Sequence, residues 1–351
     1  SSALRAATPV VRRYSKTGAA MTAMTGSGTG PTAVVANPIF ASFRTASKEY
    51  IIMYGGQTTT AVSDALWLIS IDSATTYTWT DLTPTTSCGA RANAGGLVMN
   101  NNKFYVIGGC SGGNGQCKSS LHSDTIVFDF NVNSLGTKAT CSATAGAGAQ
   151  PRGLADHAVV YHKSFGGIDR AVVFGGTKLL DNDDDIHTDE LFVINLATNT
   201  WTIYEPTPAT GHFPGIPSPR IEFGYTKFRS QMLVFGGHNV RDGTLWALDL
   251  NTFDWSVVEA KKCSSCNFAV LPTPVYRQVM WAVEETNFQD KVHMFGGRVQ
   301  TAQGGTGDNA LLYTMDMTNT TATLSGTTNL LSGVLSVKPN SNGQAVFNDL
   351  R

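Results

Sequence analysis

The sequence has little charge, no long apolar run and no sustained helical periodicity. Of its 351 residues only 15% are charged, and the net charge is -1. There is therefore no basic surplus to bind the phosphates of a nucleic acid. No stretch approaches the roughly 18 consecutive apolar residues that a membrane-spanning helix needs. Because apolar residues do not recur at helical spacing, we expect strands to dominate.

Acidic residues are absent from the first 48 positions, which contain Arg5, Arg12, Arg13 and Lys16. An Arg-rich, acid-free stretch is typical of a mitochondrial transit peptide. A mitochondrial or cytoplasmic location is therefore kept as an alternative. The interpretation that we favour is an ordered N-terminal arm or strand.

The chain has six cysteines. An even number in a Thr- and Ser-rich chain of low charge indicates disulfides and an oxidising compartment. We expect three pairs: Cys110 with Cys117, Cys263 with Cys266, and Cys88 with Cys141. A redox or zinc role for Cys263-Ser-Ser-Cys266 is disfavoured, since no helix start and no second Cys pair accompany it. The Asn319-Thr320-Thr321 triplet is a glycosylation sequon. Together these features predict a secreted or cell-surface glycoprotein.

Five short apolar runs end in a pair of glycines, at intervals of 53, 67, 61 and 60 residues. The pairs are Gly55-Gly56, Gly108-Gly109, Gly175-Gly176, Gly236-Gly237 and Gly296-Gly297. After each pair an apolar strand ends near an acid or amide, at Asp72, Asp129, Asn195, Asp249 and Asp316. In three units a tryptophan follows six or seven residues later, at Trp79, Trp201 and Trp255. Such self-similarity at a fixed period indicates a repeat architecture with four short strands per unit.

This order of features resembles the kelch repeat. Units two and five depart from it because they lack the tryptophan and offer "KATCSA" and "TATLSG" as fourth strands. The resemblance implies an all-β protein, a β-propeller of four-stranded blades. We expect one propeller domain: an N-terminal arm or closing strands in 1–30, five blades in 31–328, and strands of a final blade in 329–351. Six blades closed by strands from both termini are favoured, with five or seven as alternatives.

The resemblance makes the glycine pairs and the three tryptophans architectural. Glycine tolerates close backbone approach and positive φ, so the chain can leave the second strand sharply. Tryptophan supplies a large apolar surface between neighbouring blades. No direct catalytic role is expected for any of these residues.

Loop lengths differ between the two faces of the expected blades. The second-to-third loops (57–64, 110–123, 177–189 and 298–309) and the inter-blade loops (83–91, 142–152, 205–219 and 259–274) are longer than the other turns. Both sets emerge on one face, to which all six cysteines also map. Long loops in a compact domain are often functional. We therefore predict a binding face there, with contacts chosen by loop position: Asp183, Asp185, His187, His212, Phe213 and Tyr276.

The stretch "DNDDDIHTDE" is the most charged part of the chain. It is not an EF-hand, because Ile186 stands where glycine is required and Phe192 where the bidentate Glu belongs. A looser structural calcium site formed by Asp181, Asp183 and Asp185 stays an alternative to a solvated acidic loop; no other cofactor is expected. His157 and His293 fall in strand patterns and are interpreted as packing residues.

No grouped copper ligands, no Glu-x-x-x-Asp-x-x-x-His iron spacing and no catalytic triad stand out. The leading hypothesis is a non-enzymatic, extracellular or cell-surface interaction module for a protein or glycan ligand. The alternatives are a structural subunit of an extracellular fibre or coat that self-assembles through terminal strands, an intracellular kelch adaptor, and a metal-dependent oxidase-like enzyme.

Overall fold

The structure of the protein is a computed structural model, and every regular element in its described part is a strand. The described residues are 12–14, 21–32, 35–112, 120–134, 136–180, 182, 184–205, 207–208, 215–238, 240, 243–261, 275–283, 291–300, 306–308, 312–317, 330–332 and 334–337. Within them no helix is long and apolar enough to cross a membrane.

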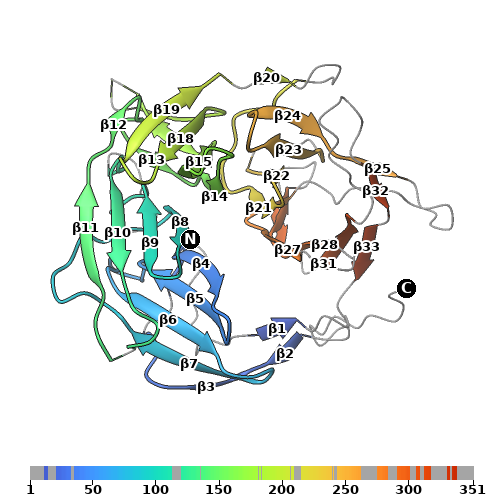
Figure 1. The fold of residues 1–351 in the computed structure, drawn as a ribbon. Helices are drawn as coiled ribbons and strands as arrows, with labels where there is room; N and C mark the ends of the chain where they lie inside the picture. Colours follow the sequence, from blue (N-terminus) through green and yellow to red (C-terminus); the bar gives the residue numbers. More distant parts are fainter. Residues whose placement is uncertain are drawn as a thin grey trace.

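Five antiparallel sheets of four strands stand side by side around a central opening, like the blades of a propeller (Figure 1). Blade 1 holds β4 (Ile39–Arg44), β5 (Glu49–Tyr54), β6 (Leu66–Ile71) and β7 (Thr76–Asp81). Blade 2 holds β8 (Gly95–Met99), β9 (Lys103–Ile107), β10 (Thr125–Asp129) and β11 (Thr140–Thr144). Blade 3 holds β14 (Ala158–Lys163), β15 (Asp169–Phe174), β18 (Leu191–Asn195) and β19 (Thr200–Tyr204). Blade 4 holds β21 (Gly224–Phe228), β22 (Gln231–Phe235), β23 (Leu245–Asp249) and β24 (Asp254–Val257). Blade 5 holds β27 (Val279–Val283), β28 (Lys291–Phe295), β31 (Leu312–Asp316) and β33 (Val334–Val337).

Position in the blade explains the composition of the strands. The second strands are covered on both faces, and β22 is buried along its whole length, which matches the apolar run that follows Gln231. The first strands line the opening, so β4 alternates instead: Ile39 is buried and Phe40 is exposed. One face of β4 therefore packs in the core, and the other faces the opening.

Four clusters of buried side chains fill the four junctions between consecutive blades. At the junction of blades 3 and 4, Phe174 packs against Trp255 with ring centroids 4.7 Å apart. Trp255 is fully buried and Trp201 is 2% exposed, as the architectural interpretation predicted, while Trp79 is only partly buried. Burying such rings stabilises the junctions that contain them. Among the described residues, no such cluster joins blade 5 to blade 1.

The glycine pairs connect each blade to the next. All five pairs have positive φ, between 64° and 127°. The second glycine donates its N–H to a carbonyl just ahead of the following blade, for example Gly56 to Arg91 (2.8 Å) and Gly237 to Val275 (3.0 Å). A Cβ on Gly236 would lie 2.1 Å from the oxygen of Val275. Only glycine fits this approach, so the sequence interpretation of the pairs is confirmed.

The chain that enters a blade also covers the outer edge of that blade. Short strands pair in parallel with the outermost strand in blades 1, 3 and 4: β3 (Thr25–Ser27) with β7, β12 (Ala147–Gly148) with β19, and β20 (Thr207–Pro208) with β24. In the same way β25 (Glu259–Lys261) pairs in parallel with β32 (Leu330–Ser332) beside blade 5. An added strand occupies edge hydrogen-bonding groups that would otherwise be open to aggregation.

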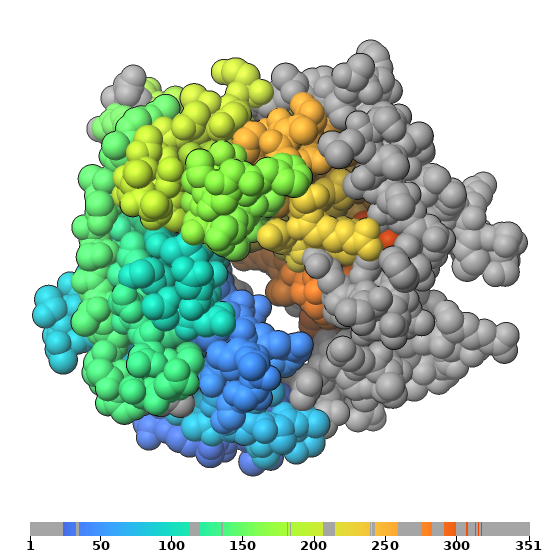
Figure 2. Space-filling model, in the orientation of Figure 1, coloured from blue at the N-terminus to red at the C-terminus, as the bar shows by residue number. Residues whose placement is uncertain are grey.

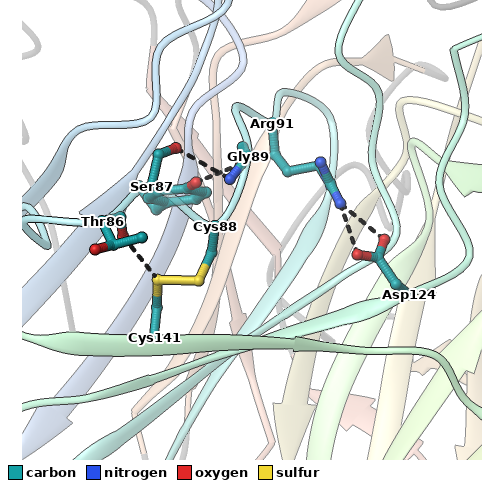
Figure 3. The surroundings of a disulfide bond; sticks show 8 residues. Thr86, Ser87, Cys88, Gly89, Arg91, Asp124 and Cys141 are labelled. Carbon is teal, nitrogen blue, oxygen red and sulfur yellow. Dashed lines mark hydrogen bonds and ion pairs between the residues drawn. A yellow bond between two sulfur atoms is a disulfide. The ribbon is translucent and has the colours of Figure 1, made fainter.

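Blade 2 replaces this edge strand with a disulfide. Cys88, in the chain that enters the blade, is bonded to Cys141 of β11 (Figure 3). The sulfur of Cys141 lies 3.4 Å from the carbonyl oxygen of Thr86. The predicted pair Cys88–Cys141 is thus confirmed. Its predicted place on the long-loop face is wrong, because β11 is the outermost strand and the disulfide lies on the outer rim.

The last strand of blade 5 comes from an unexpected part of the chain. The sequence offered "TATLSG" for this strand and assigned 329–351 to a final blade. In the structure β33, at Val334–Val337, pairs with β31 and completes blade 5. Fourth strands are half exposed and carry a weak apolar pattern, so sequence alone did not locate this one. The hairpin of β1 (Arg12–Tyr14) and β2 (Met21–Ala23) lies between blades 1 and 5 (Figure 1).

Candidate binding site at the channel mouth

Five residues at equivalent positions, each two residues before the first strand of a blade, have left-handed backbone conformations. Their φ values lie between 51° and 59°. The residues, which we call the mouth ring, are Asn37, Asn93, Asp156, Glu222 and Arg277. Asn and Asp tolerate this region, but it is uncommon for Glu and Arg. Such conformations gather at functional sites when the surrounding structure holds them in place.

Backbone hydrogen bonds join the mouth ring from blade to blade. Asn93 N–H donates to Asn37 O (3.2 Å), and Asp156 N–H donates to Asn93 O (2.9 Å). Arg277 N–H donates to Glu222 O (2.6 Å). Within the described part of the chain, no backbone hydrogen bond joins Asp156 to Glu222. The ring is therefore interrupted at the junction of blades 3 and 4, beside its charged members.

The charges of the mouth ring are concentrated in blades 3, 4 and 5. Glu222 and Arg277 form an ion pair, with side chains 16% and 52% exposed. The Asp156 carboxyl lies near both, and no hydrogen bond or ion pair connects it to another described residue. Burial, and then repulsion from Glu222, raise the pKa of Asp156 to about 7, against the opposing effect of Arg277. One carboxyl group at the mouth is thus left without a cation of its own.

Below the mouth ring, the first strands of the five blades enclose a channel with a cavity volume of about 630 Å³. Figure 2 shows the channel open at the centre of the molecule. Its wall combines polar groups with apolar side chains that include Phe40 and Val279, which are 53% and 61% exposed. The other end carries a cation: the Lys227 ammonium lies 5.7 Å from the Tyr161 ring centre. The channel therefore presents exposed apolar side chains between two charged ends.

The mouth ring opens on the face that carries the longer loops. Ala36, next to Asn37, pairs with Gln57 in a second-to-third loop (N–O 2.7 Å). His238, in the corresponding loop of blade 4, donates its N–H to Ile221 beside Glu222 (2.9 Å). The channel mouth and the predicted binding face are thus the same region.

Residues next to the mouth ring are structural. His157 is 5% exposed, and burial lowers its pKa to about 4, so it is neutral at pH 7. Gln278 occupies the same position in blade 5, and its Nε2 donates to Phe235 O (2.7 Å). His293 is also 5% exposed and stacks on Trp281. The interpretation of His157 and His293 as packing residues is confirmed.

Arg91 holds the start of blade 2 from the same face. Its side chain is 5% exposed, and Nη2 donates to both carboxylate oxygens of Asp124 at 2.8 Å (Figure 3). Tyr54 Oη donates to the Gly89 carbonyl at 2.5 Å. These contacts hold the connection that bears Cys88, next to the disulfide. A paired, buried arginine of this kind is a structural residue.

The structure describes three of the six predicted contact residues. Tyr276 lies in β26 (Val275–Tyr276), which pairs with β29 (Arg298–Gln300), and it is only 5% exposed. Its ring packs against His238 at 5.0 Å, so it offers little surface to a ligand, and its selection as a contact is wrong. Asp185 is partly buried and His187 exposed in β17 (Asp185–His187), which pairs with β16 (Thr177–Leu179). The long loops thus contain strands, and β16 pairs in turn with β13 (Leu154–Ala155).

Several predictions lie outside the described residues: Asp181, Asp183, His212, Phe213, Cys117, Cys263, Cys266 and Asn319. Cys110 is disulfide-bonded, to a residue outside the described part. Among the described residues, no group of three or more His, Cys, Asp or Glu side chains could hold a metal ion. The calcium site stays a prediction because two of its three carboxylates are not described.

Sequence reasoning missed the mouth ring because its members share no residue type. The signal that could have found them is positional, since each lies two residues before a first strand. Aligning the units on those strands, rather than on the glycine pairs, would have placed Asp156, Glu222 and Arg277 in one column.

Repeated four-stranded sheets around a central channel define a β-propeller. The family described as the KLHDC2/KLHL20/DRC7 Kelch-repeats domain matches residues 20–212 and 166–331. The chain therefore belongs to the kelch-repeat family.

Two known proteins are similar to it. Over 136 residues the chain is 32% identical to host cell factor homolog hcf-1 of Caenorhabditis elegans, a match covering 37% of this chain and 16% of that protein. The chain thus spans about a sixth of that relative's length. The solved structure of YjhT shares the fold with a TM-score of 0.52 at 14% identity, covering 90% of this chain and 97% of that one.

Proposed function

We propose that this kelch-repeat chain is a protein-interaction module that binds its partner at the mouth ring. The observation that carries this proposal is the mouth ring itself. Its charged and amide residues, held in uncommon backbone conformations, surround an open channel on the long-loop face. Kelch membership supports protein binding as the kind of activity. Loops set on a rigid scaffold are a frequent place for recognition.

The test selects peptides from a displayed random library on the immobilised full chain. Selected peptides should bind Glu222→Gln at least tenfold more weakly than wild type, because this variant breaks the ion pair with Arg277. The matched control is Asp129→Asn, which breaks an ion pair with Lys103 (2.6 Å) at the opposite end of blade 2. Equal loss with both variants, or with neither, would remove the mouth ring as the binding site.

We further propose that the protein works outside the cytosol as a secreted or cell-surface module. The disulfide between Cys88 and Cys141, in a chain of low charge, supports this location. The intracellular adaptor alternative keeps the same binding site but requires reduced thiols at these two positions. Intact mass of the native protein, before and after reduction, separates the two, and native free thiols at Cys88 and Cys141 would favour the adaptor.

A sixth blade between blades 5 and 1 is also part of the proposal. The β1–β2 hairpin lies in this interval (Figure 1), and both neighbouring blades lack a junction cluster there among the described residues. Closure would remove the two remaining sheet edges. Deleting residues 1–23 should then lower the melting temperature and expose the inner strands of blades 1 and 5 to hydrogen exchange. Unchanged exchange in β4 and β27 would argue for an open ring.

A further inference from the structure

The mouth ring and the channel beneath it have opposite chemistry, arranged along one axis. The carboxyl groups of Asp156 and Glu222 lie at the mouth, where Arg277 neutralises only Glu222. The charges of these three residues sum to minus one when Asp156 is ionised. The wall below them carries the exposed apolar side chains of Phe40 and Val279. A ligand that enters from this face meets the negative charge first and the apolar surface second.

The distances suit one kind of ligand. Phe40 follows Asn37 by three residues and Val279 follows Arg277 by two, which places them about 7–10 Å below the mouth ring at the rise of a strand. These two side chains are the most exposed apolar groups of the channel wall. A ligand therefore needs a cation that stays at the mouth and an apolar group that extends inward from it.

A lysine or arginine side chain of a partner does not meet this requirement. Its charge lies at the tip of an apolar stem, so insertion from the mouth would carry the cation past the carboxyl groups into the apolar part of the channel. Taking an ion out of water without a partner is strongly unfavourable. A chain N-terminus has the opposite arrangement, because the α-ammonium lies at the base of the first side chain.

We propose that the channel mouth captures the free N-terminus of a partner protein whose first residue is apolar. The α-ammonium lies beside Asp156 and Glu222, and the first side chain enters the channel toward Phe40 and Val279. The inference rests on the proposed function and names the partner chemistry for that site. Charge complementarity with the unpaired carboxyl, together with the exposed apolar side chains of the open channel, supports this occupant.

The experiment uses a peptide, Phe-Gly-Ser-Gly-Ser-Gly, with a fluorophore at its C-terminus and a free α-amino group. Fluorescence polarisation measures its affinity for the full chain at pH 7.5. Acetylation of the α-amino group should weaken binding at least tenfold, as should replacement of the first Phe by Gly. Both comparisons change only the peptide and therefore do not depend on the folding of a variant.

Protein variants locate the effect. In Asp156→Asn the free and acetylated peptides should bind alike, whereas the control Asp129→Asn should keep the tenfold difference. Equal affinity of both peptides for wild type would overturn the inference, and so would an acetylation effect that survives Asp156→Asn. Binding of 2-phenylethylamine as tight as that of the peptide would also overturn it, in favour of a small-molecule amine site.

The failure of this inference and the failure of the proposed function are distinguishable. Library-selected peptides can need Glu222 while the Phe-first peptide shows no binding up to about 1 mM, on the order of the weakest useful dissociation constant. In that case the mouth ring binds proteins through other chemistry. If no selected peptide responds to Glu222→Gln, the proposed function fails together with this inference.

Discussion

Removing the Cys88–Cys141 disulfide should destabilise the protein by an amount that follows from the chain it closes. The two cysteines are 53 positions apart. The chain-entropy relation gives about 14 cal/mol/K for a loop of this length, or about 4 kcal/mol at 25 °C. Spread over 351 residues, with an unfolding entropy of about 2.1 cal/mol/K per residue, this lowers the melting temperature by about 5 °C.

The assay is thermal unfolding of Cys88→Ser/Cys141→Ser followed by circular dichroism. Reduction of the wild type is a less specific test, because Cys110 is also disulfide-bonded. The matched control is Ser142→Ala, an exposed neighbour on the same strand. A second readout is hydrogen exchange of residues 83–91, which should rise in the double variant because blade 2 has no parallel edge strand to hold this connection.

A double variant that melts within about 1 °C of wild type would contradict this prediction, because a destabilisation of less than about 1 kcal/mol gives a shift of that size. Such a result would mean that Arg91, Asp124 and the core of blade 2 hold the connection without the disulfide. A drop in stability with unchanged hydrogen exchange in 83–91 would contradict only the expectation that the disulfide holds this connection in place.

Three further predictions concern the architecture and the mouth ring. Gly236→Ala should lower the free energy of unfolding by about 3 kcal/mol or more in a urea denaturation assay, because its Cβ would meet Val275 O at 2.1 Å and its φ is 66°. In the same assay Gly166→Ala, whose Cβ would have its nearest contact at 3.9 Å, should lower it by less than about 1 kcal/mol. Trp255→Ala should cost about 3–5 kcal/mol of unfolding free energy, since the ring is fully buried between blades 3 and 4, and a loss below about 1 kcal/mol would contradict its role. Because the folded pKa of Asp156 is raised to about 7, the contribution of this carboxyl to the free energy of unfolding is fully present below pH 4 and is lost as the pH rises through 7. Urea titrations should show that Asp156→Asn lacks this decline, which is at most about 4 kcal/mol. An identical pH profile for both proteins would show that this carboxyl titrates normally.

Much of the fold could be predicted from the sequence because its determinants are local. Each glycine pair ends a second strand, and the part of each such strand next to the glycines is largely apolar because it is buried. Residue type alone reports these conditions, since only glycine adopts the backbone geometry and a continuous apolar run marks the burial. The pairing of Cys88 with Cys141 could likewise be inferred, once the other cysteines were assigned to their nearest neighbours.

The candidate site could not be predicted in this way, because its residues form a site only through their positions relative to one another in the folded chain. Asp156, Glu222 and Arg277 are ordinary surface types in the sequence, and Tyr276 looked as suitable as any of them. Packing of β26 against β29 buries Tyr276, whereas the turn before each first strand brings the mouth ring to the channel axis. The strand β33 shows the same limit, because a fourth strand is defined by its partner β31 and not by a pattern of its own.

The amino-acid sequence by itself determined the repeat, the strands and the residues that join one blade to the next, because each depends on backbone conformation or burial at a single position. The tertiary structure alone decided which side chains meet. Blades far apart in the chain place Asp156, Glu222 and Arg277 side by side, and the charge that one carboxyl group retains depends on the two others. Such a property belongs to a set of distances, and those distances exist only after the blades have packed against one another.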